Sequence, residues 1–376
     1  MLRVERVTQV KDLNPLKDEW NRLVARSLMP EVYVTHEWVS LWCRYFVRDG
    51  DLRVLTVWDG ARLVGVAPLM QSNKRLKGFP IRQLGFLLNR CNVRSNLVLA
   101  PDRMEDCLAA ILEYLQAARG EWDVLSLYGM AESSLVPETV TAVLRKGRAG
   151  RMPLLPMSTW ENAIVRLEGG WDAYLAGKTG HHRKRARKEM QILESMGTLL
   201  FESYAKPEQV TAYLDHFLGI EAKSWKVQRG ESLSERPDYH EFYRQIARSH
   251  AERDEWRAWV LRIDDRPMAT IFGLLYEGTL YAEKTTYVAG VEKASPGSAV
   301  IRHAIEDSFR EGVAKEMDLD QQTHFTSRWQ THSHRYHHVE IFNGGPYSMA
   351  LYGLKRLLRG WRGLREAATP KAEHSS

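Results

Sequence analysis

A loop of small residues, Ser295-Pro296-Gly297-Ser298, offers the clearest local chemistry in this 376-residue sequence. It lies between a strand-like run at 279–287 and a helical pattern at 297–310. In order, its first residues can cap the helix, fill the first helical position and let a ligand approach the backbone closely. Backbone N–H groups and the dipole at a helix start attract anions, so the loop predicts a site for a phosphate or pyrophosphate. An ordinary capped helix is the alternative.

Two acidic side chains fall in the strands that flank this loop. Alternation along 279–287 places Glu283 and Tyr287 on one face of the first strand, and Asp318 belongs to a strand predicted at 315–320. If the anion site holds the donor of an acyl group, an amine that receives this group must first lose the proton of its ammonium form. A carboxylate beside the site could accept that proton, so Glu283 and Asp318 are candidate general bases. The alternative for Glu283 is an ion pair on the surface of the sheet.

Histidines are concentrated shortly after these strands. The group consists of His324, His332, His334, His337 and His338. Imidazole is a common transition-metal ligand, but no Asp, Glu or Cys accompanies the group at a fixed ligand spacing, so the sequence predicts no metal site. We expect some of these histidines to line a groove and one of them to accept a proton.

Two segments carry dense positive charge. The segment 181–188 has five Lys and Arg in six positions and begins a predicted helix, on which Arg183 and Arg187 are candidate contacts for nucleic acid, anionic lipid or a phosphorylated substrate. A solvated basic face is the alternative. The last predicted helix, 347–366, separates Leu and Trp from Lys and Arg, a pattern typical of contact with a membrane surface. It could equally cover the second module with its apolar side.

The composition is that of a globular protein. The chain has 44% hydrophobic and 27% charged residues, a formal charge of +6, and three cysteines without metal-type spacing, which argues against disorder and a disulfide framework. The charge permits an anionic partner without identifying it. The charged N-terminus and the absence of a long apolar run predict neither a signal peptide nor a transmembrane segment. We therefore expect a cytoplasmic protein that could also associate with the inner face of the membrane.

The elements that must position these residues occur twice in the same order. In each part an apolar hairpin comes first, and a helix followed by a strand comes later. The predicted elements of the first part are helices around 16–23 and 38–45, a hairpin at 52–70, a strand at 95–99, a helix at 102–118, a strand at 122–127 and a helix at 137–148. Those of the second part are a hairpin at 259–275, strands at 279–287 and 315–320, and a helix at 297–310. This repetition predicts an α/β fold with a mixed sheet, built from two modules.

The boundary between the modules is predicted from a segment with two prolines, 151–156, which has the composition of a linker. We place an N-terminal domain at 1–155 and a C-terminal domain at 156–346. The basic helix 347–366 and a polar tail, 367–376, follow, and we expect the tail to be disordered.

With these residues in view, the chain resembles the GNAT-superfamily proteins of the CelD, or cellulose-biosynthesis, type, which are relatives of the FemAB aminoacyl transferases. The similarity covers nearly all of residues 1–345. It depends on the order and spacing of several short motifs. These are Trp38-Val-Ser-Leu-Trp42, Val64-Gly-Val-Ala-Pro-Leu69, Trp122-Asp-Val-Leu125, the basic helix 181–196 before Gly197, Ser295-Pro296-Gly297, Gly312, Asp318 and Arg328-Trp329.

The resemblance implies two GNAT folds side by side, of which the second binds the acyl donor, acetyl-CoA or another acyl-CoA. In that fold the pantetheine arm of the donor inserts where two parallel strands splay, and its pyrophosphate lies on the helix start between them. The resemblance therefore assigns donor binding to Ser295, Gly297, Ser298 and Tyr287. It assigns acid and base roles to Glu283 and Asp318, and contacts with substrate or anions to Arg183, Arg187, Arg328 and Trp329.

The chain departs from this family at the acceptor side. The full glycine-rich phosphate loop is absent, and Phe325 and Thr326 stand where relatives tend to have Tyr and Lys. His324 could replace the lost polar group as a catalytic side chain.

Three functions follow as hypotheses. The first is transfer of an acyl group from acyl-CoA or a carrier thioester to an amine or hydroxyl, on a sugar or an envelope precursor. The second is FemAB-like transfer of an aminoacyl group from tRNA, with the basic segment 181–188 holding RNA phosphates. The third is a catalytically silent component of polysaccharide assembly.

Overall fold

The structure is a computed structural model, and it describes residues 2–90, 92–148, 150–230 and 232–368, with the side chains of the last helix described as far as Arg359. Of the three cysteines, Cys43 and Cys107 are buried as small apolar side chains. Cys91 and residues 369–376 of the predicted tail lie outside the described residues.

The first part of the chain contains most of the predicted elements, with a β-hairpin added. Its elements are β1 (Arg3–Val7), α1 (Lys17–Arg26), α2 (His36–Phe46), β2 (Val54–Asp59), β3 (Arg62–Ala67), β4 (Leu69–Leu76), β5 (Phe79–Phe86), β6 (Val98–Leu99), α3 (Met104–Ala117), β7 (Val124–Ala131) and α4 (Val136–Arg145). Strands β1, β4 and β5 were not predicted. The strand predicted at 95–99 is confined to two residues, because the polar side chains before it are buried in a loop.

The second part repeats the order of the first. Its elements are β8 (Leu154–Arg166), α5 (Trp171–Ala176), α6 (Gly180–Glu194), β9 (Leu199–Tyr204), α7 (Val210–Glu221), α8 (Trp225–Gln228), α9 (Pro237–Ala251), β10 (Trp256–Ile263), β11 (Arg266–Tyr276), β12 (Thr279–Tyr287), α10 (Pro296–Glu311), β13 (Glu316–Gln321), β14 (His332–Phe342) and α11 (Pro346–Ala368). Strands β8, β9 and β14 were not predicted.

The repeat is visible in how the strands pair. In the first part β5 runs parallel to β7, and α3 connects them; in the second part β12 runs parallel to β13, and α10 connects them. In each part an antiparallel hairpin precedes the parallel pair, β2 with β3 and β10 with β11. The predicted α/β fold with a mixed sheet built from two modules is confirmed.

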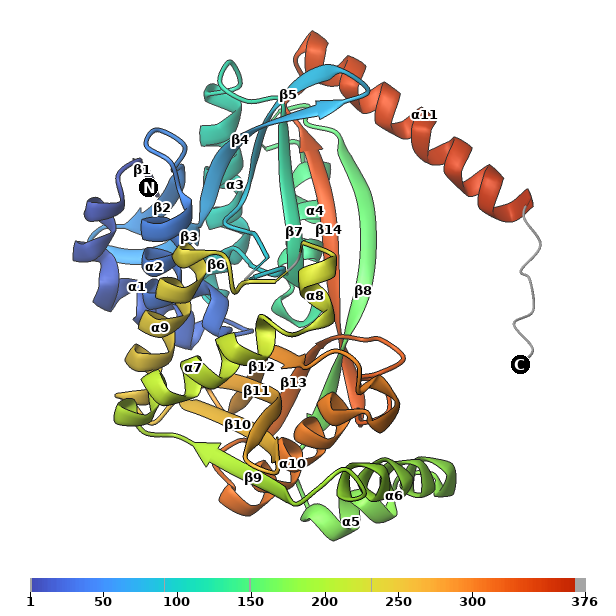
Figure 1. The fold of residues 1–376 in the computed structure, drawn as a ribbon. Helices are drawn as coiled ribbons and strands as arrows, with labels where there is room; N and C mark the ends of the chain where they lie inside the picture. Colours follow the sequence, from blue (N-terminus) through green and yellow to red (C-terminus); the bar gives the residue numbers. More distant parts are fainter. Residues whose placement is uncertain (1, 91, 149, 231, 369–376) are drawn as a thin grey trace.

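Two long strands join the modules. The larger sheet has the order β4-β5-β7-β14-β8-β13-β12-β11-β10-β9, so that β8 and β14 lie at its centre. Figure 1 shows both strands running from one half of the molecule to the other. Strand β8 begins at Leu154, so the end of the predicted linker is the start of this strand. The division of the chain near residue 155 stays a prediction.

Aromatic side chains hold the helices of the two parts together. In α1 and α2, spacings of three and four residues put Trp20, Leu23, Trp38 and Trp42 on buried faces, as the helical periodicity predicts. The ring of Trp38 packs edge-on against Phe242 of α9, with ring centroids 5.2 Å apart. One hydrophobic core therefore extends from the helices of the first part to those of the second.

The last helix, α11, extends beyond the predicted 347–366 by one or two residues at each end and points away from the body of the molecule (Figure 1). Leu357, Met349 and Tyr347 are among its exposed side chains. Within the described residues, none of the helices combines the length and the apolar character that crossing a bilayer requires.

Candidate active site

A cavity opens where the parallel strands β12 and β13 separate. Their pairing covers three residues on each strand, Thr279–Tyr281 and Glu316–Asp318. Beyond these pairs the strands diverge around a cavity of about 650 Å³. Its walls come from β12, the start of α10, the loop after β13, and Trp225 of α8. Within the described residues, the edge of β12 that faces this space pairs with no strand beyond Tyr281. The carbonyl of Thr285 accepts from Nζ of Lys226 at 3.1 Å, and the other backbone groups along this edge can meet a ligand.

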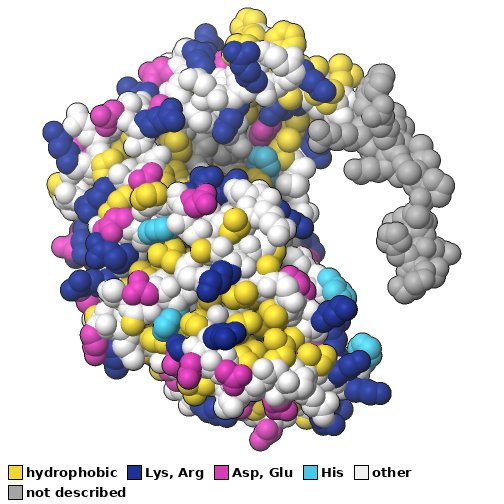
Figure 2. Space-filling view, in the orientation of Figure 1, with side chains coloured by type: hydrophobic (Ala, Val, Ile, Leu, Met, Phe, Trp, Pro, Cys, Tyr) yellow, Lys and Arg dark blue, Asp and Glu magenta, His cyan; other side chains and the backbone are white. Residues whose placement is uncertain are grey.

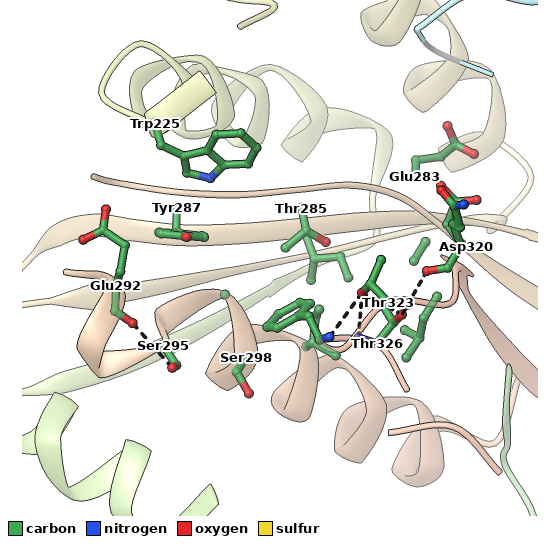
Figure 3. A pocket seen from close by; sticks show the side chains of 17 residues that line it. Trp225, Glu283, Thr285, Tyr287, Glu292, Ser295, Ser298, Asp320, Thr323 and Thr326 are labelled. Carbon is green, nitrogen blue, oxygen red and sulfur yellow. Dashed lines mark hydrogen bonds between the residues drawn. The ribbon is translucent and has the colours of Figure 1, made fainter. Parts of the chain in front are cut away.

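The side chains at the two ends of the cavity differ in kind. Figure 3 shows Ser295, Ser298 and Tyr287 near one end, at the start of α10, and Glu283 and Asp320 at the other end, with Thr285 between them. Glu283 and Tyr287, predicted to share one face of this strand, both line the cavity. An elongated ligand with a phosphate group at one end and a reactive group at the other fits this arrangement.

Glu283 lies at an irregularity in β12. The partner of Phe272 on β11 is Lys284, whereas the partner of Gly273 is Ala282, so Glu283 is left over as an extra residue. Such a bulge bends its strand and redirects the side chain, and bulges are frequent next to active sites. Here it coincides with the start of the divergence from β13 and turns the Glu283 carboxylate to the inner end of the cavity.

The start of α10 differs from the predicted cap. Pro296 occupies the first turn as expected, but Ser295 has φ 52° and its side chain makes no capping hydrogen bond, so the predicted side-chain cap is wrong. The Ser295 hydroxyl instead donates to the carbonyl of Glu292 at 3.5 Å. The N–H groups of Ser298 and Ala299 donate to the Ser295 carbonyl at 2.9 and 3.2 Å. Because proline has no N–H, this leaves Gly297 as the natural backbone donor to a ligand in the first turn.

Gly297 provides room at the same point. A Cβ added at Gly297 would lie 3.1 Å from Cδ1 of Tyr287 and 3.8 Å from Cζ of Phe325, both of which line the cavity. Glycine therefore allows the helix start to approach β12 closely while the cavity stays open.

Ser298 is buried and connects α10 to the basic helix α6. Its hydroxyl donates to Glu189 at 3.1 Å and accepts from Nη2 of Arg328 at 2.7 Å. Glu189 also accepts from Nη1 of Arg328 and from Nε of Arg185, each at 3.0 Å. Burial tends to raise the pKa of Glu189, but the two guanidinium groups outweigh it and lower that pKa. Arg328 is thus part of an ion-pair cluster that fixes α6 beside the cavity.

The remaining predicted site residues lie outside the cavity lining. Arg183 and Arg187 are exposed on α6, and Arg183 donates to the carbonyl of Ala176 at 2.8 Å. Basic side chains gather over this region, at the lower right of Figure 2. Trp329 is buried in the core of the second module, and His324 is exposed on the loop after β13. Their predicted roles in binding and catalysis stay predictions.

The Glu283 carboxylate accepts a hydrogen bond from the first module. The hydroxyl of Tyr33 donates to Oε1 of Glu283 at 2.5 Å. Burial raises the pKa of Glu283 to about 7, although Lys284 and the bond from Tyr33 act in the opposite direction. A carboxylate with this pKa can accept a proton near neutral pH and can later release it.

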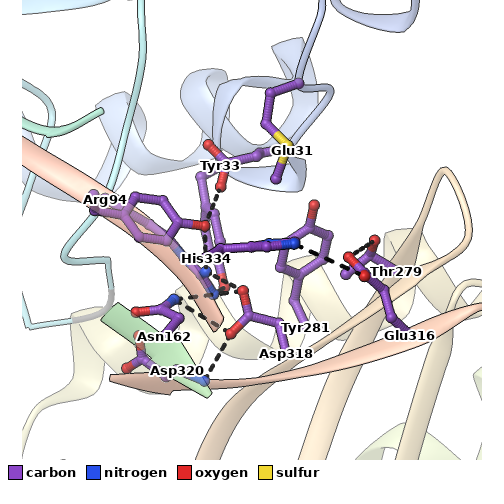
Figure 4. Close-up of polar contacts among 12 residues, drawn as sticks. Glu31, Tyr33, Arg94, Asn162, Thr279, Tyr281, Glu316, Asp318, Asp320 and His334 are labelled. Atoms are coloured by element: carbon purple, nitrogen blue, oxygen red, sulfur yellow. Dashed lines mark hydrogen bonds and ion pairs between the residues drawn. The ribbon is translucent and has the colours of Figure 1, made fainter. Parts of the chain in front are cut away.

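A buried polar network extends from this contact through Arg94 (Figure 4). Nη2 of Arg94 donates to the Tyr33 hydroxyl at 3.0 Å, and Nη1 donates to the Tyr336 hydroxyl at 3.1 Å and to the Asp318 carboxylate. Tyr336 in turn donates to Glu31 at 3.0 Å. Burial raises the pKa of Glu31 to about 7. The network therefore joins the two modules directly behind the Glu283 end of the cavity.

Asp318 has a different position from that of Glu283. Besides Arg94, it accepts from Nδ2 of Asn162 at 3.3 Å and from the backbone N–H of Asp320 at 2.8 Å. It is 1% exposed, so its oxygens are engaged by protein groups and have little contact with the cavity. This geometry makes Asp318 the buried counter-ion of Arg94.

Sequence reasoning missed the residues that complete this site, namely Glu31, Tyr33, Arg94, Asn162 and Trp225. Arg94 belongs to the polar run Asn92-Val-Arg-Ser-Asn96, which reads as a solvated loop but is largely buried. A loop so rich in amide and hydroxyl side chains between two apolar segments is a signal that could have been noticed. No spacing in the sequence connects that loop with Glu283.

Comparisons with known proteins agree with this architecture. Residues 180–320 match the family described as acetyltransferase (GNAT) domain. Among solved structures, FemX is similar with a TM-score of 0.57 and 8% identity, over 94% of this chain and 99% of that chain. No curated protein sequence matches the chain.

Two further similar structures carry the name of one enzyme. The C-terminal domain of a protein described as a lysylphosphatidylglycerol synthetase, from Agrobacterium fabrum, has a TM-score of 0.53 and 15% identity, over 92% of this chain and 96% of that chain. L-PGS from Bacillus licheniformis has a TM-score of 0.52 and 12% identity, over 93% and 97%. At these identities the likeness concerns the fold alone, and the match to the GNAT family covers residues 180–320, in the second of the two modules.

Proposed function

We propose that this chain transfers an acyl group from a thioester, either acyl-CoA or a carrier-bound phosphopantetheine, to an amine or hydroxyl. The observation that carries the proposal is the cavity at the divergence of β12 and β13, with the start of α10 at one end and Glu283 at the other. Backbone groups of β12 beyond its pairing with β13 can hydrogen-bond a pantetheine arm, and the start of α10 favours its pyrophosphate. Positioning and polarisation of the thioester are the main contributions to the rate.

Glu283 is the general base in this proposal. The nucleophilic nitrogen or oxygen attacks the thioester carbonyl, the new C–N or C–O bond forms, the C–S bond breaks, and the thiolate leaves. Glu283 accepts the proton that the nucleophile loses, directly or through a water molecule, and that proton can return to the thiolate. Tyr33 and Arg94 position the carboxylate, and Asp318 holds Arg94 by a buried ion pair.

The acceptor is expected to approach the Glu283 end of the cavity. Asp320 lines this end beside Glu283, and two carboxylates attract an ammonium group before it is deprotonated. A sugar amine or another envelope precursor has the required group. Association of α11 with an anionic membrane surface would bring the protein to such an acceptor, because α11 exposes Leu357 together with Arg356 and Arg359. Sedimentation with phosphatidylglycerol vesicles tests this association. If the same fraction of protein sediments with vesicles of neutral lipid, the proposed association is wrong.

A second candidate is transfer of an aminoacyl group from tRNA, as in the FemAB-type enzymes that the sequence resembles. The observation that favours it is the position of α6. The contact of Glu189 with Ser298 fixes this helix beside the phosphate end of the cavity, where Arg183 and Arg187 are exposed. Exposed Lys and Arg side chains at such a place could contact RNA phosphates.

Two measurements separate these candidates. One is calorimetric titration with acetyl-CoA and longer acyl-CoAs, and the other is binding of aminoacyl-tRNA at two salt concentrations. The proposal predicts binding of at least one thioester that is unaffected in an Arg183→Gln/Arg187→Gln variant. Salt-sensitive tRNA binding that this variant loses, with no thioester binding, would favour the second candidate instead.

A further inference from the structure

Three possible metal ligands come together on a sheet face outside the cavity. Strand β14 contributes His332 and His334, and β13 contributes Glu316 from the other side of β8. Nε2 of His332 lies 3.6 Å and Nε2 of His334 lies 4.0 Å from the same oxygen, Oε2 of Glu316. The three ligand atoms all lie within 4.8 Å of one another. The acidic ligand that the histidine group lacks in the sequence is therefore supplied by a neighbouring strand.

The separations suit a small divalent ion. Zinc binds imidazole nitrogen and carboxylate oxygen at about 2.0–2.2 Å with tetrahedral geometry, so that its ligand atoms lie roughly 3.3–3.5 Å apart. The two separations from Glu316, 3.6 and 4.0 Å, exceed this by about 0.1–0.7 Å, and the two histidine nitrogens lie within 4.8 Å of each other, so side-chain rotations can bring the three atoms to these distances. The three side chains are 21–29% exposed, so an ion can reach them from solvent and keep a water molecule as its fourth ligand.

The surrounding hydroxyls orient two of the ligands. Oγ1 of Thr331 accepts from the backbone N–H of Arg166 at 2.9 Å and lies 3.1 Å from the carbonyl of Ile164 and 3.0 Å from Nδ1 of His332. When this hydroxyl donates to the Ile164 carbonyl, it accepts from Nδ1 of His332, and the lone pair of Nε2 is then directed toward Glu316. On the carboxylate side, Thr279 donates to Oε1 of Glu316 at 3.1 Å, which leaves Oε2 facing the histidines.

Two imidazole nitrogens and a carboxylate oxygen face the same small space. Lone pairs that face one another repel, and a metal ion between them removes this repulsion. Outer contacts of the kind that Thr331 and Thr279 provide are usual around metal-binding histidines and carboxylates.

We propose that Glu316, His332 and His334 bind a divalent transition-metal ion of the zinc class. Imidazole nitrogen with one carboxylate oxygen is a ligand set that suits zinc, and it does not suit the oxygen-preferring Mg²⁺ or Ca²⁺. The ion would fasten β13 to β14 across β8, at the point where the chain returns from the second module to pair with β7. This site is separate from the cavity and does not depend on the proposed acyl transfer.

The same strand offers a matched control. Nε2 of His337 lies 3.4 Å from Oε1 of Glu132, so it is also a half-buried histidine beside a carboxylate. No further His, Cys, Asp or Glu completes a three-ligand group there within the described residues. If the contacts of Glu316 with His332 and His334 were ordinary histidine–carboxylate contacts, substitutions there and at His337 should have the same effect on metal binding.

The test uses the full chain, from which metal is first removed by dialysis against a chelator. Binding of Co²⁺ is then followed by visible absorption, and binding of Zn²⁺ is measured in competition with a chromophoric chelator. We expect one ion per chain, and loss of at least about tenfold in affinity in His334→Ala and in the nearly isosteric Glu316→Gln, since even loss of an outer contact costs 10–100-fold. His337→Ala should bind as the wild type does. The proposal is overturned if the wild type binds neither ion, or if Glu316→Gln, with an unchanged circular dichroism spectrum, binds as tightly as His337→Ala.

Discussion

Tyr33 and Glu283 are 250 positions apart in the chain, and the phenol of the first donates to the carboxylate of the second at 2.5 Å. The contact joins the two modules at the inner end of the cavity. Glu283 is also the bulged residue at which β12 leaves β13. The proposed general base thus depends on a side chain from the first module, which gives that module a role in the chemistry of the second.

Replacing Glu283 with Gln should lower turnover by about 10²–10⁴-fold, the usual contribution of a general base. Burial raises the pKa of Glu283 to about 7, so kcat/KM of the wild type should rise with pH, pass its midpoint near pH 7 and level off at higher pH. Release of free thiol, measured with an amine acceptor between pH 5.5 and 9, gives this profile. The acid limb should be missing in Glu283→Gln.

Affinity for the donor provides the control for this variant. The amide of Gln has nearly the volume of the carboxylate, so the affinity for acyl-CoA should stay within about threefold. A variant that loses donor affinity and keeps its turnover at saturation would remove Glu283 as the base.

Replacing Tyr33 with Phe should shift the acid limb to higher pH. The hydrogen bond from Tyr33 lowers the pKa of Glu283, and a bond to a charged group contributes about 1.5–3 kcal/mol, so its loss should raise that pKa by about one unit or more. Tyr204→Phe is the matched control, because the Tyr204 hydroxyl donates to Glu202, which does not line the cavity. An acid limb of Tyr33→Phe that coincides with that of the wild type would show that this contact does not tune the base.

Replacing Asp318 with Asn should destabilise the fold by about 3–5 kcal/mol, because it leaves the buried guanidinium of Arg94 without its counter-ion. Urea unfolding measures this loss. The double variant Arg94→Met/Asp318→Asn should lose less stability than the sum of the losses measured in the two single variants. If Asp318 were instead the catalytic base, Asp318→Asn would retain its stability and lose turnover.

Much of the fold could be predicted from the sequence, because local patterns determine it. The helices with Trp20 and Trp38 have a clear helical period, and the hairpins have short turns between β-rich runs. The repeated order then predicts the neighbouring strands β12 and β13. Strand β14 was missed because its histidine-rich sequence lacks the apolar alternation of a strand, although it lies at the centre of the larger sheet.

The donor side of the site was more predictable than its inner end. Gly297, Tyr287 and Glu283 come from one strand, loop and helix that are consecutive in the sequence, so alternation and loop composition suffice to group them. Tyr33 and Arg94 reach the site through tertiary packing across the two modules, which no local pattern encodes. For the same reason the sequence could not show that the Asp318 carboxylate forms a buried ion pair with Arg94.

The most direct test of the central claim is calorimetric titration of acyl-CoA into the wild type, Gly297→Val and Gly219→Ala. Valine at position 297 would press on Tyr287 and project into the cavity, whereas Gly219, in α7, has open space around its Cβ position. The account predicts that the wild type and Gly219→Ala bind at least one acyl-CoA equally well, and that Gly297→Val binds it at least about tenfold more weakly. It would be contradicted if Gly297→Val bound the thioester as tightly as the wild type does, or if the wild type bound none.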